Sequence, residues 1–325
     1  MCLASRPRSG FRPFDTVSVL SAPAAPSSAE RGRVWAALFV VWVLWSTSYL
    51  ALGHLVTLLP PLLAVALRNA LAAVALIGVA VLCRQPAPGR RQLLRPALVG
   101  LLLVGLGESL LSLGLQTASP GRSAVLYAAV PILTSVLLAC SGQRLNRGQT
   151  AGAVLGVCGV ALLNLDLLRP GQAGGPRGEG LVLASAVCAA LAAVLATRAG
   201  RSPHRMPESA LWAAGVQLLV GASVAGLGGL VRGEVWPGWP PLQAWAALAW
   251  LSLVLSAGGY AAYNHLQRVS GPLVAASYAY VNPPVALALA WLLTGEALDA
   301  RELAAVAIVL AGVLTTVLAG RVNRP

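Results

Sequence analysis

The sequence has little charge and no lysine. Only 10% of its 325 residues are charged, whereas 57% are hydrophobic. So little charge cannot solvate the exterior of a soluble protein of this length. All 23 basic residues are arginines, and the acidic residues number only 10. The chain is therefore predicted to be an integral membrane protein.

Cysteine and histidine are also scarce, and neither forms a recognisable pattern. The five cysteines include no C-x-x-C pair, and the three histidines lie far apart, so neither a metal site nor a disulfide framework is predicted. The sequence lacks a phosphate-binding P-loop, an H-E-x-x-H motif and a G-x-S-x-G motif. We expect no cofactor, no direct use of ATP and no enzymatic activity.

The formal net charge of +13 raises the question of nucleic-acid binding, since arginine-rich faces neutralise phosphates. The arginines here lie in short segments between apolar runs instead of on one soluble face. That distribution is typical of the orientation signals of membrane proteins. We expect the lipid bilayer, and no nucleic acid, as a partner.

The apolar runs are long enough to cross a hydrocarbon core of about 30 Å as helices. Pro and Gly residues punctuate the intervals between them. The predicted fold is an all-α integral membrane protein of ten transmembrane helices, at residues 34–53, 61–82, 96–117, 121–141, 149–166, 179–197, 209–230, 243–265, 272–294 and 303–320.

The arginines also predict the orientation of the chain. Ten spans place both termini on one side, which then holds 17 arginines, against 5 on the other side, with Arg68 inside a span. Basic residues are retained on the cytoplasmic side of a membrane. Both termini are therefore predicted to be cytoplasmic, in a multi-pass protein of the cell (plasma or inner) membrane.

The chain repeats itself at an offset of 153 residues. This shift brings Tyr127 onto Tyr280, Pro131 onto Pro284, and residues 142–145 onto 295–298. Each half then holds five spans, an odd number, so the halves enter the membrane in opposite senses. Such inverted repeats are a recurring plan of secondary transporters, because two similar halves can rock around a site at the midplane.

Several of these features resemble those of the drug/metabolite transporter superfamily, and within it the EamA-like branch of ten-helix transporters. The resemblance extends over residues 34–320 and rests on short signatures. These are Trp45-Ser46 in the first span, Pro60-Pro61 followed by Arg68, Gly152, Gly156 and Gly159 at the end of the first half, and Tyr280, Pro283, Gly295-Glu296 and Gly312 in the second. The sequence departs from the family at Gln143, which occupies the first-half position of Glu296.

The predicted organisation follows from the spans and the repeat. It comprises a disordered cytoplasmic tail (1–33), a first five-helix EamA-like repeat (34–167), a linker (168–178), a second five-helix repeat (179–320) and a cytoplasmic C-terminus (321–325). The glycines of the fifth span form a face of small residues that suits close helix packing, either within the bundle or in a homodimer.

Polar residues inside the spans point to the interior, since they are costly in lipid. Glu108, Ser112 and Gln116 recur every four residues in the third span, and Ser256, Tyr260 and Asn264 do so in the eighth. The alternative is that such faces only join helices. The residues predicted to line a cavity for a small-molecule substrate are Trp45, Ser46, Tyr49, Arg68, Glu108, Ser112, Gln116, Tyr127, Ser256, Tyr260, Asn264, Tyr278 and Asn282.

Arg68 and Glu108 are the ionisable residues well inside the predicted spans. At about 1.5 Å per residue, their depths in adjacent helices allow them to meet. One interpretation is a structural ion pair, because a lone charge in the membrane is costly. The other is that Glu108 binds a proton or a cationic substrate group while Arg68 positions it or binds a carboxylate. The sequence leaves both open.

We interpret the chain as a secondary transporter that moves a small metabolite by alternating access between its two repeats. The family resemblance implies export of amino acids or related small amphiphiles. The proton is one candidate coupling ion, and no spacing rule reveals the substrate. The alternative is an integral-membrane protein without transport activity, either an enzyme or a structural or receptor protein, which would give no reason for inverted repeats.

Overall fold

The computed structural model describes residues 28–140, 147–163, 176–197, 209–269, 278–294 and 299–322. Within these ranges every regular element is a helix and none is a strand. This confirms the all-α prediction for the described part of the chain. In lipid, a helix satisfies all its backbone hydrogen bonds within one segment, which is why apolar runs of this length fold this way.

Several helices change their winding without breaking. The elements are α1 (Ser28–Phe39), η1 (Val40–Leu44), η2 (Trp45–Thr47) and α2 (Ser48–Leu58); α3 (Pro61–Leu82); α4 (Arg90–Gly100), η3 (Leu101–Glu108) and α5 (Ser109–Gly114); α6 (Pro120–Tyr127) and α7 (Val130–Cys140); α8 (Arg147–Leu163); α9 (Pro176–Thr197); α10 (Ala210–Val231); α11 (Leu242–Ala249), η6 (Trp250–Gly258) and α12 (Gly259–Val269); α14 (Tyr278–Thr294); and α15 (Ala300–Val322). Here η1, η3 and η6 are π-helical and η2 is a 3₁₀ turn.

Seven of the described helices are long and apolar enough to cross a membrane. Two shorter apolar helices lie within α14 and α15, at Pro284–Leu293 and Leu303–Gly312. The chain is therefore a membrane protein with several transmembrane helices, as predicted. The seven are Gly32–Leu58, Pro61–Leu82, Arg90–Gly114, Pro120–Leu137, Arg177–Ala196, Ala210–Val231 and Leu242–Leu266.

Helix ends mostly lie within a few residues of the predicted boundaries, and two of the differences are informative. Helix α1 begins at Ser28, six residues before the predicted span, with Glu30 in its first turn, where a carboxylate suits the helix dipole. The predicted fourth span is divided between α6 and α7 at residues 128–129. Pro131 has no backbone N–H to continue the hydrogen bonds of α6, which accounts for the division.

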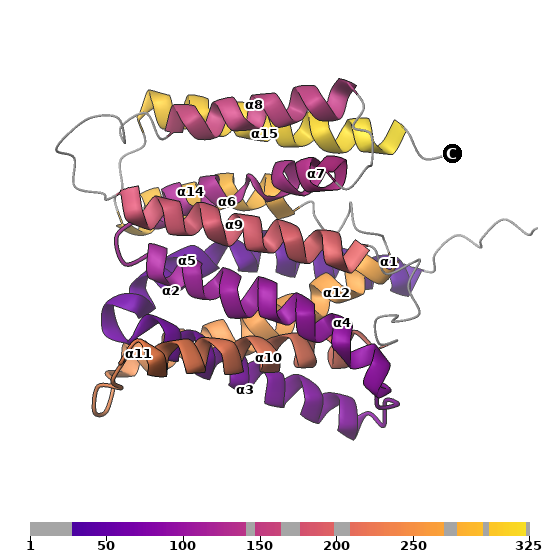
Figure 1. The fold of residues 1–325 in the computed structure, drawn as a ribbon, viewed down its shortest axis with the longest axis vertical. Coiled ribbons are helices and arrows are strands. Elements are labelled where there is room, and N and C mark those ends of the chain that lie inside the picture. The colour runs from indigo at the N-terminus through magenta and orange to yellow at the C-terminus, as the bar shows by residue number, and fades with distance from the viewer. Residues whose placement is uncertain are drawn as a thin grey trace, which may run out of the picture.

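Two pairs of helices lie at opposite ends of the longest axis of the molecule, α8 with α15 and α3 with α10 (Figure 1). In the first pair the backbones touch, since a Cβ on Gly312 would lie 2.6 Å from the Gly156 nitrogen and 2.7 Å from the Gly152 carbonyl oxygen. The glycine face of the fifth span is thus covered by α15 of the same chain.

The helix that opens each predicted half packs against the other half. Helix α9 lies on α4, η3, α5, α6 and α7. Ser185 of α9 donates a hydrogen bond to the Gly107 carbonyl (2.7 Å), and Arg95 of α4 donates two to the Leu195 carbonyl (2.8 and 3.0 Å). In return, the first helical segment contacts α11, η6, α12 and α14. This exchange brings Trp45 beside the second half.

Candidate functional site

Glu108, the last residue of η3, accepts hydrogen bonds from three side chains of other helices. Its Oε2 accepts from Arg68 Nη2, with which it forms an ion pair, and from Asn69 Nδ2 at 2.7 Å. Its Oε1 accepts from the Tyr260 hydroxyl at 2.6 Å. The two charged side chains are only 6% and 11% exposed. The predicted depths of Arg68 and Glu108 are therefore compatible with their contact.

Asn69 connects the carboxylate to the second half, and the sequence analysis did not single it out. Its Nδ2 donates to the Val65 carbonyl (3.0 Å) as well as to Glu108, and its Oδ1 accepts from the Ser256 hydroxyl at 2.9 Å. Asn69 is fully buried. As the one amide side chain of its apolar span, directly after Arg68, it carried a signal that could have identified it.

One donor atom of this network has no partner within the described residues. Arg68 Nε is buried and makes no hydrogen bond there, although a guanidinium carries five N–H donors in a rigid fork. A buried donor without an acceptor costs about 1–3 kcal/mol. Arg68 therefore has unused capacity to bind an anionic oxygen while it holds Glu108.

Four aromatic rings form a cluster that reaches the carboxylate through Tyr260. The Trp45 ring centroid lies 5.5 Å from that of Tyr260, 5.6 Å from Tyr263 and 5.2 Å from Tyr278. Trp45 Nε1 donates to the Leu255 carbonyl at 2.9 Å. The indole fits here because Gly259 has no side chain: a Cβ at this position would overlap Nε1 and lie 2.9 Å from Cδ1 and Cε2.

Two buried amides extend the polar contacts on either side of the rings. Asn264 donates to the Tyr260 carbonyl (2.8 Å) and to Gln217 Oε1 of α10 (3.4 Å). The Asn282 amide nitrogen, oriented so that both amide atoms are satisfied, lies 3.1 Å from Ser46 Oγ and 3.0 Å from the Trp42 carbonyl. Ser46 itself donates to the Trp42 carbonyl.

Other predicted residues lie outside these contacts. Ser112 is fully buried and donates to the Pro61 carbonyl at 3.2 Å, which ties α5 to the start of α3. Tyr49 and Tyr127 form a further ring pair with centroids 6.2 Å apart, and Tyr127 lies close enough to Glu108 and Tyr260 to interact with both electrostatically. Gln116 is exposed, because α5 ends at Gly114 and the chain turns there. Its four-residue spacing from Ser112 therefore does not place it on the same face.

The arrangement suits reversible binding of a polar solute. A carboxylate, a guanidinium, three asparagine amides, hydroxyls and aromatic rings lie in a buried region between helices far apart in the sequence. Within the described residues no group of three His, Cys, Asp or Glu side chains is arranged to hold a metal ion. The residues that make these polar contacts come from the first span, from α3 and η3, and from η6 and α12.

The EamA-like transporter family matches the sequence twice, over residues 33–165 and 176–318. The chain belongs to this family. Membership confirms the resemblance to drug/metabolite transporters. Arg68, Asn69 and Glu108 lie in the first match of this EamA-like chain, and Ser256 and Tyr260 lie in the second.

Two curated relatives and one solved structure resemble the EamA-like chain. The uncharacterized inner membrane transporter YedA of Escherichia coli (strain K12) is 30% identical over 285 residues, 87% of this chain and 90% of that protein. The uncharacterized transporter YoaV of Bacillus subtilis (strain 168) is 28% identical over 41% of this chain and 49% of that protein. One crystal structure superposes with a TM-score of 0.61 over 90% of this chain and 99% of that one, at 22% identity, which indicates a shared fold alone.

Proposed function

We propose that this chain is a secondary transporter that moves a small metabolite across the inner membrane by alternating access between two inverted five-helix repeats. The printed names of YedA and YoaV support transport, and that of YedA supports the inner membrane. The repeats are residues 34–167 and 179–320, joined by the linker 168–178. Both termini are cytoplasmic in this proposal, as the 17 arginines on that side favour.

Ten transmembrane helices fit the described elements. The predicted fifth, ninth and tenth spans overlap α8, α14 and α15, of which α8 and α14 have 17 residues each and are shorter than the seven long apolar helices. The tight pairing of α8 with α15 supports a position for both within the bundle. Gln143 and Glu296, which distinguish the two repeats, lie outside the described residues.

The observation that carries the proposal is the position of Glu108. The first family match supplies Arg68 and Asn69 as its donors, and the second supplies Tyr260. A movement of one repeat against the other would therefore change the hydrogen bonds of this carboxylate. The relative position of the two repeats would thus affect the charged group at the site, as expected for a site between the halves of an alternating-access transporter.

The charges at this site favour a zwitterionic solute. The Arg68–Glu108 pair is neutral as a whole, and an added single charge in the membrane interior costs about 2.5–3.5 kcal/mol on insertion scales. A solute with both an ammonium and a carboxylate adds no net charge: the ammonium binds Glu108, and the carboxylate binds the unused Arg68 donor. This supports the amino acids and related amphiphiles that the family suggests.

The aromatic cluster that includes Tyr260 suits the apolar part and the cationic end of such a solute. Ring faces attract ammonium groups by about 0.5–2 kcal/mol, depending on how fully the contact is desolvated. Trp45, Tyr260, Tyr263 and Tyr278 therefore provide a wall that binds apolar surface and also tolerates a positive charge. Export is the direction we propose, and Glu108 is the group through which a proton would couple to it.

The test compares cells that overproduce the native chain with cells that produce Glu108→Gln at the same membrane level. Untargeted analysis of the growth medium should find one or more amino-acid-like metabolites enriched only by the native protein. An unchanged medium, together with no uptake by cells or vesicles, would favour the alternative of a membrane protein without transport activity.

A further inference from the structure

Helices α3 and α10 pack antiparallel and end in the same kind of turn. Arg84 and Gly233 both have positive φ, 52° and 73°. The next residue in each case closes a six-residue turn, with Gln85 N donating to the Ala80 carbonyl and Glu234 N to the Gly229 carbonyl, each at 2.9 Å. This is the common helix ending in which a left-handed residue follows the last turn. The two helices overlap the second predicted span of each half, 61–82 and 209–230, so the turns that end them are compared as equivalent parts of the two repeats.

Each turn reaches the start of the neighbouring helix, but the two ends differ. At one end, Glu234 Oε2 accepts from the first N–H groups of α3, Leu62 N and Leu63 N, both at 3.0 Å. Ser112 of α5 also bonds to the Pro61 carbonyl there and is fully buried. At this end, hydrogen bonds therefore connect α3 both to α5 and to the turn after α10.

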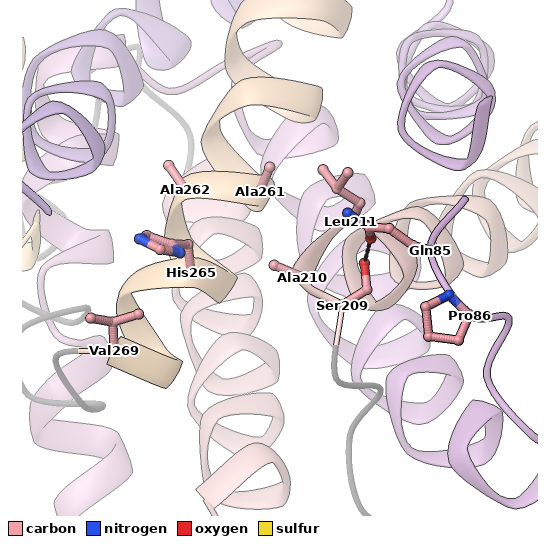
Figure 2. A pocket seen from close by; sticks show the side chains of 9 residues that line it. All are labelled: Gln85, Pro86, Ser209, Ala210, Leu211, Ala261, Ala262, His265 and Val269. Atoms are coloured by element: carbon pink, nitrogen blue, oxygen red, sulfur yellow. Dashed lines mark hydrogen bonds between the residues drawn. The ribbon is translucent and has the colours of Figure 1, made fainter. Parts of the chain in front are cut away.

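At the other end, Gln85 accepts a hydrogen bond from Ser209, the N-terminal cap of α10, and an open pocket lies beside them (Figure 2). Its volume is ≈ 670 Å³. Ala261, Ala262, His265 and Val269 of α12 form one side of it (Figure 2). His265 follows Ser112 by 153 residues, the offset of the sequence repeat. Ser112 and His265 thus occupy equivalent positions of the two repeats, but Ser112 bonds to the start of α3 whereas His265 lines the pocket.

The pocket and Glu108 are connected through helix α12, which lines the pocket with four residues and carries Tyr260. His265 adjoins Asn264, whose amide bonds to Gln217 of α10 and to the Tyr260 carbonyl. Tyr260, five residues or about 7.5 Å along the helix from His265, donates to Glu108. Two residues that line the pocket, Leu211 and Ala261, pack against the apolar cluster that includes Tyr260.

We propose that this pocket is the cytoplasmic mouth of the transport path and that the structure is open to the cytoplasm and closed to the outside by Glu234 and Ser112. In the opposite arrangement, Gln85 accepts hydrogen bonds from the first N–H groups of α10, in the way that Glu234 now accepts them from α3. His265 then contacts the start of α10 and fills the pocket. The inference rests on the proposed function and orientation.

The first test is cysteine labelling in inverted membrane vesicles, with a charged maleimide that does not cross lipid and with mass spectrometry to locate the label. Maleimide reacts with thiolate, which forms in water and not in lipid. We expect Ala262→Cys to react at least about tenfold faster than Leu219→Cys, as one pKa unit of thiol desolvation would give. Leu219 is 46% exposed but lies in the middle of α10. Equal rates would overturn the mouth assignment.

The second test adds Glu234→Ala. Loss of its bonds to α3 should lower the labelling of Ala262→Cys from the cytoplasmic side and raise that of Ser112→Cys from the outside, changing the ratio of the two rates by about tenfold. Gln85→Ala should change the ratio in the opposite direction. An unchanged ratio in both variants would show that these residues do not hold the two ends.

These labelling rates need no transported solute, so the two proposals fail separately. Transport by the native protein with Ala262→Cys unlabelled would remove the mouth assignment and leave the transporter. If labelling is as expected but no solute is moved, the proposed transport function is wrong. The pocket is then not the mouth of a transport path.

Discussion

The Tyr260 hydroxyl donates a hydrogen bond to Glu108 at 2.6 Å and so joins α12 to η3 across the boundary of the two family matches. Tyr260 also contacts Trp45 of the first span. One side chain thus links the carboxylate to the aromatic wall. Any solute that binds Glu108 will compete with this hydroxyl or share the carboxylate with it.

Tyr260→Phe should lower transport by about 10- to 100-fold, because a hydrogen bond to a charged group contributes about 1.5–3 kcal/mol. The ring and its contact with Trp45 remain. Initial rates of solute movement in vesicles, normalised to the amount of protein in the membrane, measure the effect.

Tyr278→Phe is the matched control for this variant. Its ring also packs on Trp45, at 5.2 Å, but its hydroxyl makes no hydrogen bond to the part of the chain that the structure describes. Its effect should be clearly smaller than that of Tyr260→Phe. Equal losses would mean that the Tyr260–Glu108 bond has no special role.

Variants of the Arg68–Glu108 ion pair test whether the pair only stabilises the fold or also takes part in transport. Arg68→Met and Glu108→Gln should each lower the thermal midpoint in detergent, since breaking a buried pair costs about 3–5 kcal/mol. The double variant should recover most of the midpoint, because it leaves no buried charge, and still not transport. If the double variant transported normally, the pair would be structural alone.

Gly259→Ala should displace Trp45, because its Cβ would overlap the indole nitrogen. We expect loss of transport and a lower thermal midpoint. Gly258→Ala adds the same methyl group one residue earlier, where the nearest described atom, the Leu253 carbonyl oxygen, would be 3.6 Å away. Transport by the two variants, measured side by side, should differ; similar activities would argue against the role of the Trp45 position.

Gly312→Ala should force α8 and α15 apart and lower the thermal midpoint, since its Cβ would lie 2.6 Å from the backbone of Gly156. Gly180→Ala in α9 meets no atom within 4 Å and should raise stability slightly, by up to about 1 kcal/mol, through helix propensity. A midpoint for Gly312→Ala at or above the native value would contradict the close packing of these helices.

Much of the fold could be predicted because local patterns determine it. Apolar length and the positions of Pro and Gly give the helices, and the depths of Arg68 and Glu108 in neighbouring spans allow their contact. The exchange of α9 between the halves could not be predicted, because it depends on contacts between distant segments, such as that of Ser185 with Gly107. Periodicity along one helix holds no information about such partners.

Four-residue spacing predicted which candidate site residues share a face only where the helix continues through all of them. Ser256, Tyr260 and Asn264 stay on one face, because η6 runs into α12 without a break. Gln116 followed the same spacing, yet α5 ends before it, so it points away from the network. Asn69 escaped notice because it lies outside any four-residue series and becomes important only through Glu108 and Ser256 of other helices.

The most direct measurement of the central claim uses purified protein in proteoliposomes. Three labelled solutes are compared: a zwitterionic amino acid with an apolar side chain, the amine that lacks its carboxylate and the acid that lacks its ammonium group. The account predicts movement of the zwitterion at an efficiency about 100-fold above that of either singly charged analogue, as the cost of one unbalanced charge implies. Equal movement of all three, or of none, would contradict it.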